Sequence, residues 1–233
     1  MNTLESSNQL INHLDAPARK LILKHSDELL LSTGTVLGQP GDANEYVYFP
    51  MNCVIALMLQ QNEEKGMEIC LVGREGMLGV EAILGVNESP YLILVQNEGS
   101  VLRIATEQLM KIIARHPSVE QHLHLYAGVL MQQLAQSSLC SHYHAVQARL
   151  ARLILMFRDR LHSNSMQLTH GLLADMLGVR RVGVTKAAGA LQKRRILRYA
   201  RGHIEITNGG ALEAISCVCY ATDKATYDTN LIE

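Results

Sequence analysis

Residues 168–208 read LTHGLLADMLGVRRVGVTKAAGALQKRRILRYARGHIEITN, and this stretch decides the fold of the C-terminal part of the chain. Apolar residues recur at helical spacing in two short runs that meet at Gly178. Glycine adopts the left-handed conformation that ends a helix at little cost. The segment from Ile196 to Ile206 then alternates apolar and polar residues around a turn at Arg201-Gly202. Together these patterns predict a helix-turn-helix followed by a wing.

Positive charge is concentrated in the same stretch. From Arg180 to Arg201 there are eight lysines and arginines and no acidic residue, although the formal net charge of the whole chain is −1. For binding to nucleic acid, a local basic cluster matters more than the net charge. We therefore predict that the helix-turn-helix and wing bind DNA. A solvated basic surface or a protein-binding winged helix is the alternative.

The expected contacts follow from the way such domains dock on DNA. The second helix, about residues 181–192, is expected to enter the major groove with its N-terminal residues facing the bases. Arg181 is the first candidate for a base contact, because arginine can bind guanine through two hydrogen bonds. Val182 offers only an apolar contact, and Thr169 is the expected N-cap of the first helix. The predicted DNA-binding residues are Thr169, Arg180, Arg181, Val182, Thr185, Lys186, Arg198 and Arg201.

Residues 28–104 consist of short apolar runs separated by glycine and polar turns. The expected strands are 29–31, 46–49, 54–59, 69–72, 91–95 and 101–104. Short strands at near-regular intervals indicate an antiparallel β-roll or jelly roll. Such a roll either holds a small ligand or is filled by its own side chains. Two short helices are expected before it, within residues 4–24, and one after it, at Thr106–Ala114.

A long helical pattern begins at Ser118 and carries a heptad seam of about three repeats. A long helix with a narrow seam between two globular parts favours pairing with a second copy of the chain. The predicted dimer interface is Val119, Leu123, Tyr126, Leu130, Gln133 and Ser137. The alternative is a helix that packs on its own β-roll. A polar break at 142–145 predicts a hinge and a domain boundary.

The next helix is expected at Val146–Leu161. Its arginines lie on other faces than its apolar residues, and most of them are expected to be solvated: Arg149, Arg152, Arg158 and Arg160. The polar segment after Tyr220 is expected to fray.

No sequence motif supports catalysis, so we predict that the protein is not an enzyme. Glu75 is interpreted as a surface charge. No cofactor and no metal site is predicted, because Cys217 and Cys219 lack two further ligands. A cytoplasmic protein without membrane contact is expected, since signal-peptide and membrane-helix patterns are missing and the five cysteines show no disulfide spacing.

The order of these parts, with LADMLGVRRVGVTKAAGAL at 173–191 and RYARGHIEIT at 198–207, resembles the cyclic AMP receptor protein/Fnr (Crp/Fnr) family of bacterial transcription regulators. The likeness covers nearly the whole chain. It implies an α+β protein with a double-stranded β-helix (jelly-roll) sensor domain of the cyclic-nucleotide-binding type at 1–117. A dimerisation helix and hinge follow at 118–144, and a winged helix-turn-helix at 145–233. The partners it implies are a second copy, a palindromic duplex DNA site and RNA polymerase.

Departures from the family concern the effector. Family members that bind cyclic AMP hold its ribose with a Gly-Glu pair and its phosphate with an Arg-Ser pair; here Val80 and Ser89-Pro90 stand at these positions. Cyclic AMP is therefore not the expected effector, because its phosphate would lack the arginine. If another small molecule binds, the resemblance places its pocket at Gly79, Glu81, Ser89 and Leu134. A carrier built on the β-roll, with a winged helix that contacts protein, is the alternative function.

Arg195 is a further departure, because relatives often have glycine between the reading helix and the wing. If the backbone needs a positive φ there, arginine is strained by roughly 1 kcal/mol. An added phosphate contact is the other interpretation.

Overall fold

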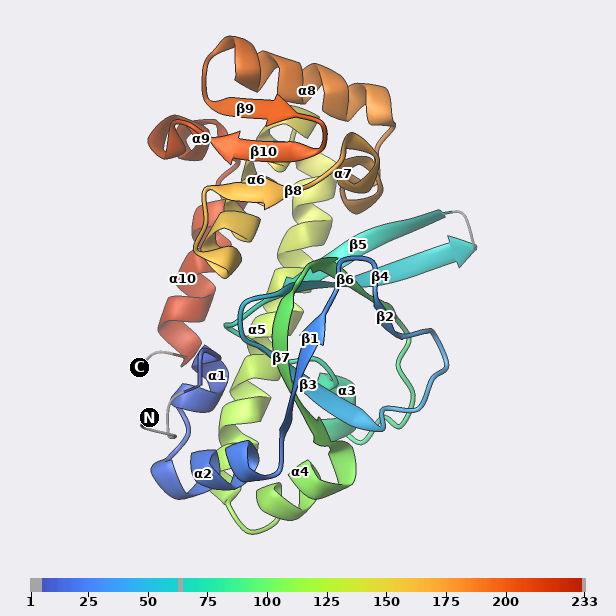
Figure 1. The fold of residues 1–233 in the computed structure, drawn as a ribbon, viewed down its shortest axis with the longest axis vertical. Helices are drawn as coiled ribbons and strands as arrows, with labels where there is room; N and C mark the ends of the chain where they lie inside the picture. The colour runs from blue at the N-terminus through green and yellow to red at the C-terminus, as the bar shows by residue number, and fades with distance from the viewer. Residues whose placement is uncertain (1–5, 63–64, 232–233) are drawn as a thin grey trace.

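The chain folds into a β-roll at one end and a helix-turn-helix with a wing at the other, joined by a long helix (Figure 1). The computed structural model describes residues 6–62 and 65–231. Two antiparallel sheets form the roll, with strand orders β1-β7-β3 and β2-β6-β4-β5. The strands are β1 (Asp27–Leu31), β2 (Val36–Gly38), β3 (Tyr46–Pro50), β4 (Val54–Asn62), β5 (Lys65–Val72), β6 (Leu92–Asn97) and β7 (Gly99–Ala105). The α+β fold class and the six expected strands are confirmed, and β2 is an additional strand.

Helices flank the roll on both sides in the chain. The first two begin at side-chain caps, since Asn8 accepts from the amide of Ile11 and Asp15 from the amide of Ala18. The helices of this part are α1 (Gln9–Asn12), α2 (Ala16–Lys24), α3 (Val80–Ile83), α4 (Thr106–Ile113) and α5 (Pro117–Tyr143). All except α3 were predicted.

The C-terminal part adds a small antiparallel sheet, in the order β8-β10-β9, to a set of helices. Its elements are α6 (Val146–Leu161), β8 (Ser165–Gln167), α7 (His170–Leu177), α8 (Arg181–Lys193), β9 (Leu197–Ala200), β10 (His203–Ile206), α9 (Gly209–Ile215) and α10 (Cys219–Leu231). Helix α6 has the predicted range. Extended residues His144 and Ala145 separate it from α5, inside the predicted break at 142–145. Within the described part of the chain, none of the helices combines the length and apolar character that crossing a bilayer requires.

Strand β4 contributes to the two larger hydrophobic cores of the described residues. Ile55 and Leu57 belong to the core inside the roll. Their neighbours Val54, Ala56 and Met58 belong to a second core, which they share with α6, α7, α8 and the wing. Because successive side chains of a strand point to opposite faces, one apolar run supplies both. The C-terminal domain therefore packs on the outer face of the roll.

The long helix α5 packs on its own roll along the seam that was predicted to pair with a second copy. The predicted residues were Val119, Leu123, Tyr126, Leu130, Gln133 and Ser137. The first five are buried, and the hydroxyl of Tyr126 donates to the carbonyl of Met77 at 3.2 Å. Ser137 is half-buried and accepts from Arg152 at 3.4 Å. The prediction is wrong for these residues, because the same chain covers the seam.

Helix α10 runs back along α5 (Figure 1). Tyr220, Asp223 and Tyr227 recur at helical spacing on its inward face. The hydroxyl of Tyr227 donates to Oε1 of Gln133 on α5. The expectation of a frayed end after Tyr220 is therefore wrong. The contacts of this face are largely polar, so a search for apolar periodicity does not find it.

Two of the four arginines of α6 are buried in ion pairs, although most of them were expected to be solvated. The Nε atom of Arg160 lies 2.8 Å from Oε1 of Glu75, and the two side chains are 7% and 13% exposed. Arg152 donates to Asp223 at 2.6 and 2.9 Å. Arg160 also donates to the carbonyl of Leu71 at 3.0 Å. The interpretation of Glu75 as a surface charge is wrong, because it is the partner that joins the roll to α6.

Replacing Glu75 by glutamine is expected to lower the free energy of unfolding by about 3–5 kcal/mol, because it leaves the buried charge of Arg160 uncompensated. Urea unfolding measures the change. Glu107→Gln is the matched control: it removes an exposed partner of Lys111, and no measurable change is expected. Equal stability of the two variants would contradict a buried ion pair between roll and α6.

Candidate nucleic-acid interface

Helix α7 begins at the predicted cap and ends at the predicted glycine. The Oγ1 atom of Thr169 accepts from the amide of Leu172 at 3.1 Å. The hydroxyl hydrogen of Thr169 remains available for an acceptor outside the helix. Gly178 ends α7 with φ of 62° and ψ of 38°, in the left-handed region that glycine tolerates.

Helix α8 presents its first turns to solvent. Arg181, Val182 and Lys186 are exposed, while Val184, Ala187, Ala188 and Leu191 hold the opposite face in the second core. Gly189 lies on the outer part of the helix, with open space beyond its Cα. Two glycines within an exposed helix cost about 1 kcal/mol each relative to alanine. Gly183 and Gly189 thus leave a helix whose backbone an external surface can approach closely.

The wing turns tightly at Arg201 and Gly202, whose φ angles are 50° and 81°. Positive φ at both residues between β9 and β10 is typical of a two-residue hairpin turn, as predicted. Arg198, on β9, pairs with Glu205 across the hairpin at 2.8 Å. Part of its charge is therefore already neutralised within the wing.

The wing turn and the start of α7 lie against each other. The amide of Leu168 donates to the carbonyl of Gly202 at 2.7 Å. The hydroxyl of Tyr199 donates to the carbonyl of Leu168 at 2.9 Å. A Cβ atom at Gly202 would lie 3.3 Å from Cγ2 of Thr169. Thr169 and the Arg201 turn consequently share one end of the domain.

His170 joins α7, α8 and the wing. Its ring stacks on Tyr199 at 4.3 Å between centroids, and its Nδ1 lies 3.1 Å from the hydroxyl of Thr185. Thr185 also donates to the carbonyl of Arg181 at 3.0 Å, so its hydroxyl is already engaged. Burial and the charge of Arg181 lower the pKa of His170, which favours the neutral ring at pH 7. Residue types alone did not indicate this role of His170 and Tyr199.

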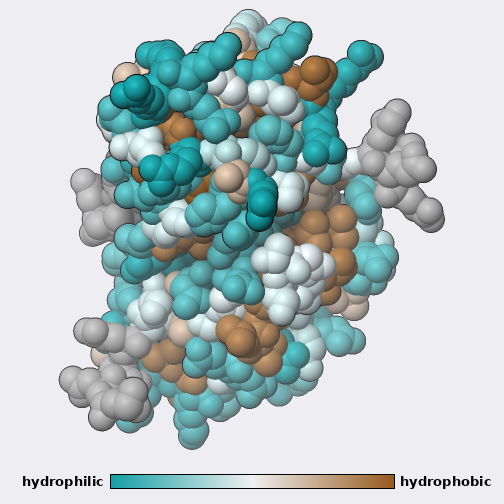
Figure 2. All heavy atoms as spheres, turned by 45° about the horizontal axis from the view of Figure 1, so that its top comes forward, coloured by the Kyte–Doolittle hydropathy of each residue, from teal (hydrophilic) through white to brown (hydrophobic). Residues whose placement is uncertain are grey.

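All the predicted DNA-binding residues are exposed in the structure. Thr169, Arg180, Arg181 and Arg201 lie near the meeting point of α7, α8 and the wing, whereas Arg198 is paired on the hairpin. Figure 2, in which the helix-turn-helix end comes forward, shows mostly hydrophilic atoms there. The remaining basic residues of the stretch, Lys186, Lys193, Arg194 and Arg195, are exposed as well. Positive charge and accessible helix therefore coincide.

Arg195 adopts a positive φ of 56° between α8 and β9. The backbone thus needs the conformation that favours glycine, and the arginine is strained there. Its guanidinium is exposed next to the basic stretch, so the strain does not exclude a phosphate contact.

The four residues expected to line an effector pocket do not share one cavity. Ser89 lines a cavity of about 380 Å³ at the edge of the roll, and its hydroxyl accepts from the amide of Tyr91 at 3.3 Å. Leu134 lines a separate cavity of about 520 Å³ between the roll, α5 and α6. Gly79 packs on Val47. Burial raises the pKa of Glu81, which is half-buried.

Comparisons with known proteins agree with this architecture. Residues 148–215 match the model of the Crp-like helix-turn-helix domain. FixK2 from Bradyrhizobium japonicum is 16% identical, with a TM-score of 0.71 over 82% of this chain and 98% of that chain. A putative Crp/Fnr-family regulator from Eubacterium rectale is 17% identical, with a TM-score of 0.69 over 91% and 99%. The c-di-GMP-responsive regulator CLP from Xanthomonas campestris is 13% identical, with a TM-score of 0.68 over 82% and 99%. No match was found among curated protein sequences.

The fold and the exposed basic helix define a class, that of two-domain proteins with an N-terminal β-roll and a C-terminal winged helix-turn-helix. Residues 148–215 match the Crp-like helix-turn-helix domain, and the chain as a whole shares its fold with solved structures of Crp/Fnr-type proteins.

Replacing Arg195 by glycine is expected to raise the free energy of unfolding by up to about 1 kcal/mol, because it relieves the positive-φ strain. Chemical denaturation measures the gain. Arg194→Gly removes the same charge one residue earlier, where φ is −83° and no strain exists, and is expected to destabilise. A similar loss in both variants would show that Arg195 is not strained.

Proposed function

We propose that the protein is a sequence-specific DNA-binding transcription regulator. One observation carries the proposal: the first turns of α8 are exposed and basic, so this end of the helix can enter the major groove of DNA. Helix-turn-helix domains place such a helix in the major groove, with its N-terminal residues at the base edges. The family match over residues 148–215 supports this role.

The contacts divide into base readers and phosphate binders. Arg181, in the first turn of α8 and exposed, is the proposed base reader. Thr169 and Arg201, at the end shared by α7 and the wing, are the proposed phosphate binders. Arg198 contributes less, because Glu205 competes for its charge. Thr185 contributes mainly by holding His170 in place.

The protein is proposed to act as a homodimer that reads a palindromic site. The proposed interface is the outer face of α5, where Leu125, Leu139 and Tyr143 are 47%, 44% and 73% exposed. Gly128 has open space at its Cα on the same helix, which permits a close approach. Exposed apolar residues at helical spacing on a long helix form the stripe that helix pairing needs. Two helix-turn-helix domains related by a two-fold axis then bind DNA half-sites about 34 Å apart.

Cyclic AMP is not proposed as the effector. Val80, at the position expected for a ribose ligand, is buried, and the hydroxyl of Ser89 is engaged by the amide of Tyr91. Neither side chain compensates the charge of a phosphate. The larger cavity between roll, α5 and α6 is the proposed place for a different small molecule.

Selection from random duplexes at several salt concentrations tests DNA binding. The wild type is expected to enrich a two-fold symmetric sequence and to lose affinity steeply with salt. Arg181→Ala should weaken binding to the preferred site by about 1–3 kcal/mol and relax preference at one position. Arg201→Asn, which tolerates the positive φ, should weaken all sequences alike and reduce the salt slope by about 1.

Arg115→Ala, at an exposed position after α4, is the control and should leave DNA binding unchanged. A wild type without enrichment and with a flat salt response would contradict DNA reading. It would favour the alternative of a carrier whose winged helix contacts protein.

The dimer is tested by the double variant Leu125→Lys with Leu139→Lys, which is expected to sediment as a monomer, because two charges would have to be buried in the interface. Both positions are exposed, so the monomer should keep its helical content. Leu30→Lys, at an 86% exposed position on β1, is the matched control and should remain dimeric. A double variant that stays dimeric would place the interface elsewhere.

A further inference from the structure

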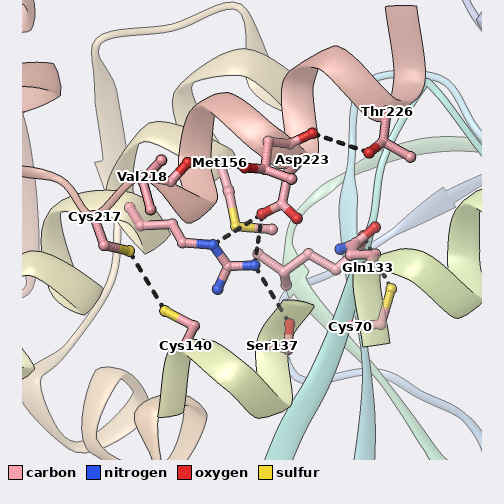
Figure 3. Close-up of polar contacts among 12 residues, drawn as sticks. Cys70, Gln133, Ser137, Cys140, Met156, Cys217, Val218, Asp223 and Thr226 are labelled. Carbon is pink, nitrogen blue, oxygen red and sulfur yellow. Dashed lines mark hydrogen bonds and ion pairs between the residues drawn. The ribbon is translucent and has the colours of Figure 1, made fainter. Parts of the chain in front are cut away.

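Three cysteines from distant parts of the sequence meet beside the junction of α5 and α6. Cys140 lies in the last turn of α5, Cys217 lies between α9 and α10, and Cys219 begins α10. Their Sγ atoms all lie within 4.8 Å of one another, and all three side chains are buried. Cys140 and Cys217 approach to 3.5 Å, as the dashed line between them shows in Figure 3.

The spacing of the sulfurs is close to that of a metal-thiolate centre. Metal–sulfur bonds of about 2.3 Å, as in zinc sites, hold the sulfurs of one ion roughly 3.8–4.0 Å apart. The three sulfurs already span the range from 3.5 Å to less than 4.8 Å. Small rotations of the side chains are sufficient to bring them to equal distances from one ion.

We propose that Cys140, Cys217 and Cys219 bind a thiophilic d10 metal ion, Zn²⁺ or Cu⁺, that ties the end of α5 to the start of α10. Soft thiolate ligands select both ions. Binding displaces the proton of each thiol, so each sulfur reaches the ion as a thiolate.

The surroundings suit a cluster of negative thiolates. The guanidinium of Arg152 lies on the same side of α5 as the cluster, 3.4 Å from the hydroxyl of Ser137. Arg152 is held in place by Asp223 on α10 and by Ser137, one turn before Cys140 on α5 (Figure 3). An ion with three thiolates has a net negative charge, and Arg152 places a guanidinium group near it, although Asp223 already neutralises part of that charge.

One ligand of the cluster borders a cavity. Cys140 lines the cavity of about 520 Å³ between the roll, α5 and α6, together with Ser137, Ser138 and Ser141. A trigonal Cu⁺ ion needs no further ligand, whereas Zn²⁺ takes a fourth, for which the cavity has room for water.

The third sulfur favours a metal centre over a disulfide. A disulfide would join Cys140 and Cys217 and leave Cys219 without a role. A metal ion uses all three thiols and needs no oxidant. Disulfide formation is therefore treated as a competing outcome of the test.

The test uses the full-length protein, reduced and kept free of oxygen. It is titrated separately with Zn²⁺ and with Cu⁺ against a chromophoric chelator, and bound metal is counted by elemental analysis. One equivalent per chain of one of these ions is expected, with a rise in Tm on binding. Cys140→Ser, Cys217→Ser and Cys219→Ser should each weaken binding by more than about tenfold, since even loss of an outer partner costs 10–100-fold.

Cys53→Ser and Cys70→Ser are the matched controls, because both thiols are buried inside the roll away from the cluster. They should keep full stoichiometry. Circular dichroism identifies any variant that fails to fold. For such a variant, Co²⁺ bound to the wild type and its thiolate-to-metal absorption replace the comparison.

Three results would overturn the proposal. The first is metal binding that keeps its stoichiometry in the triple serine variant. The second is metal binding by the wild type that is no tighter than nonspecific binding to surface groups. The third is a mass lower by two hydrogens with a Cys140–Cys217 crosslink and no bound metal. None of these readouts depends on DNA, so the metal site and the proposed regulator function fail or stand separately.

Discussion

The alternation of side chains along β4 is the constraint on which the rest of the structure depends. Ile55 and Leu57 fill the roll, while Val54, Ala56 and Met58 support α6 and the helix-turn-helix. A shift of one residue in register would turn each set of side chains to the opposite face of the sheet, so that neither core would keep its packing. The β-roll and the helix-turn-helix domain therefore share this sheet, and the core of the helix-turn-helix domain is incomplete without the outer face of the roll.

Polar contacts then fix the orientation of the C-terminal domain on the outer face of the roll. Glu75 holds Arg160, Asp223 holds Arg152, and Gln133 accepts from Tyr227. Buried ion pairs add little net stability compared with apolar packing, but breaking one is costly. Apolar surfaces tolerate sliding more readily than paired charges do. These pairs consequently favour one angle between α5 and α6, and with it one position of α8.

The sequence predicts those parts of the protein whose signal is local. Helix caps, the turns at Gly178 and Arg201-Gly202, the strands and the reading helix follow from spacing and residue type. What covers a surface is not local: the seam at Val119–Ser137 has the same periodicity whether a second copy or the roll packs on it. Helix α10 was missed because its inward residues are polar, and the cysteine cluster because Cys140 is distant in the chain from Cys217. His170 gave no signal, since its role exists only after three elements meet.

Helix α10 also has a consequence for the order in which the molecule is assembled. It packs on α5, yet about 75 residues separate the two helices, which a ribosome adds in about 4–15 s. During this interval the roll and α5 can already be folded, while the side of α5 around Gln133 has no cover. The DNA-reading domain follows, and its angle becomes fixed only when the last helix emerges and docks. Residues of α10 thus set the orientation of a surface that was synthesised before them.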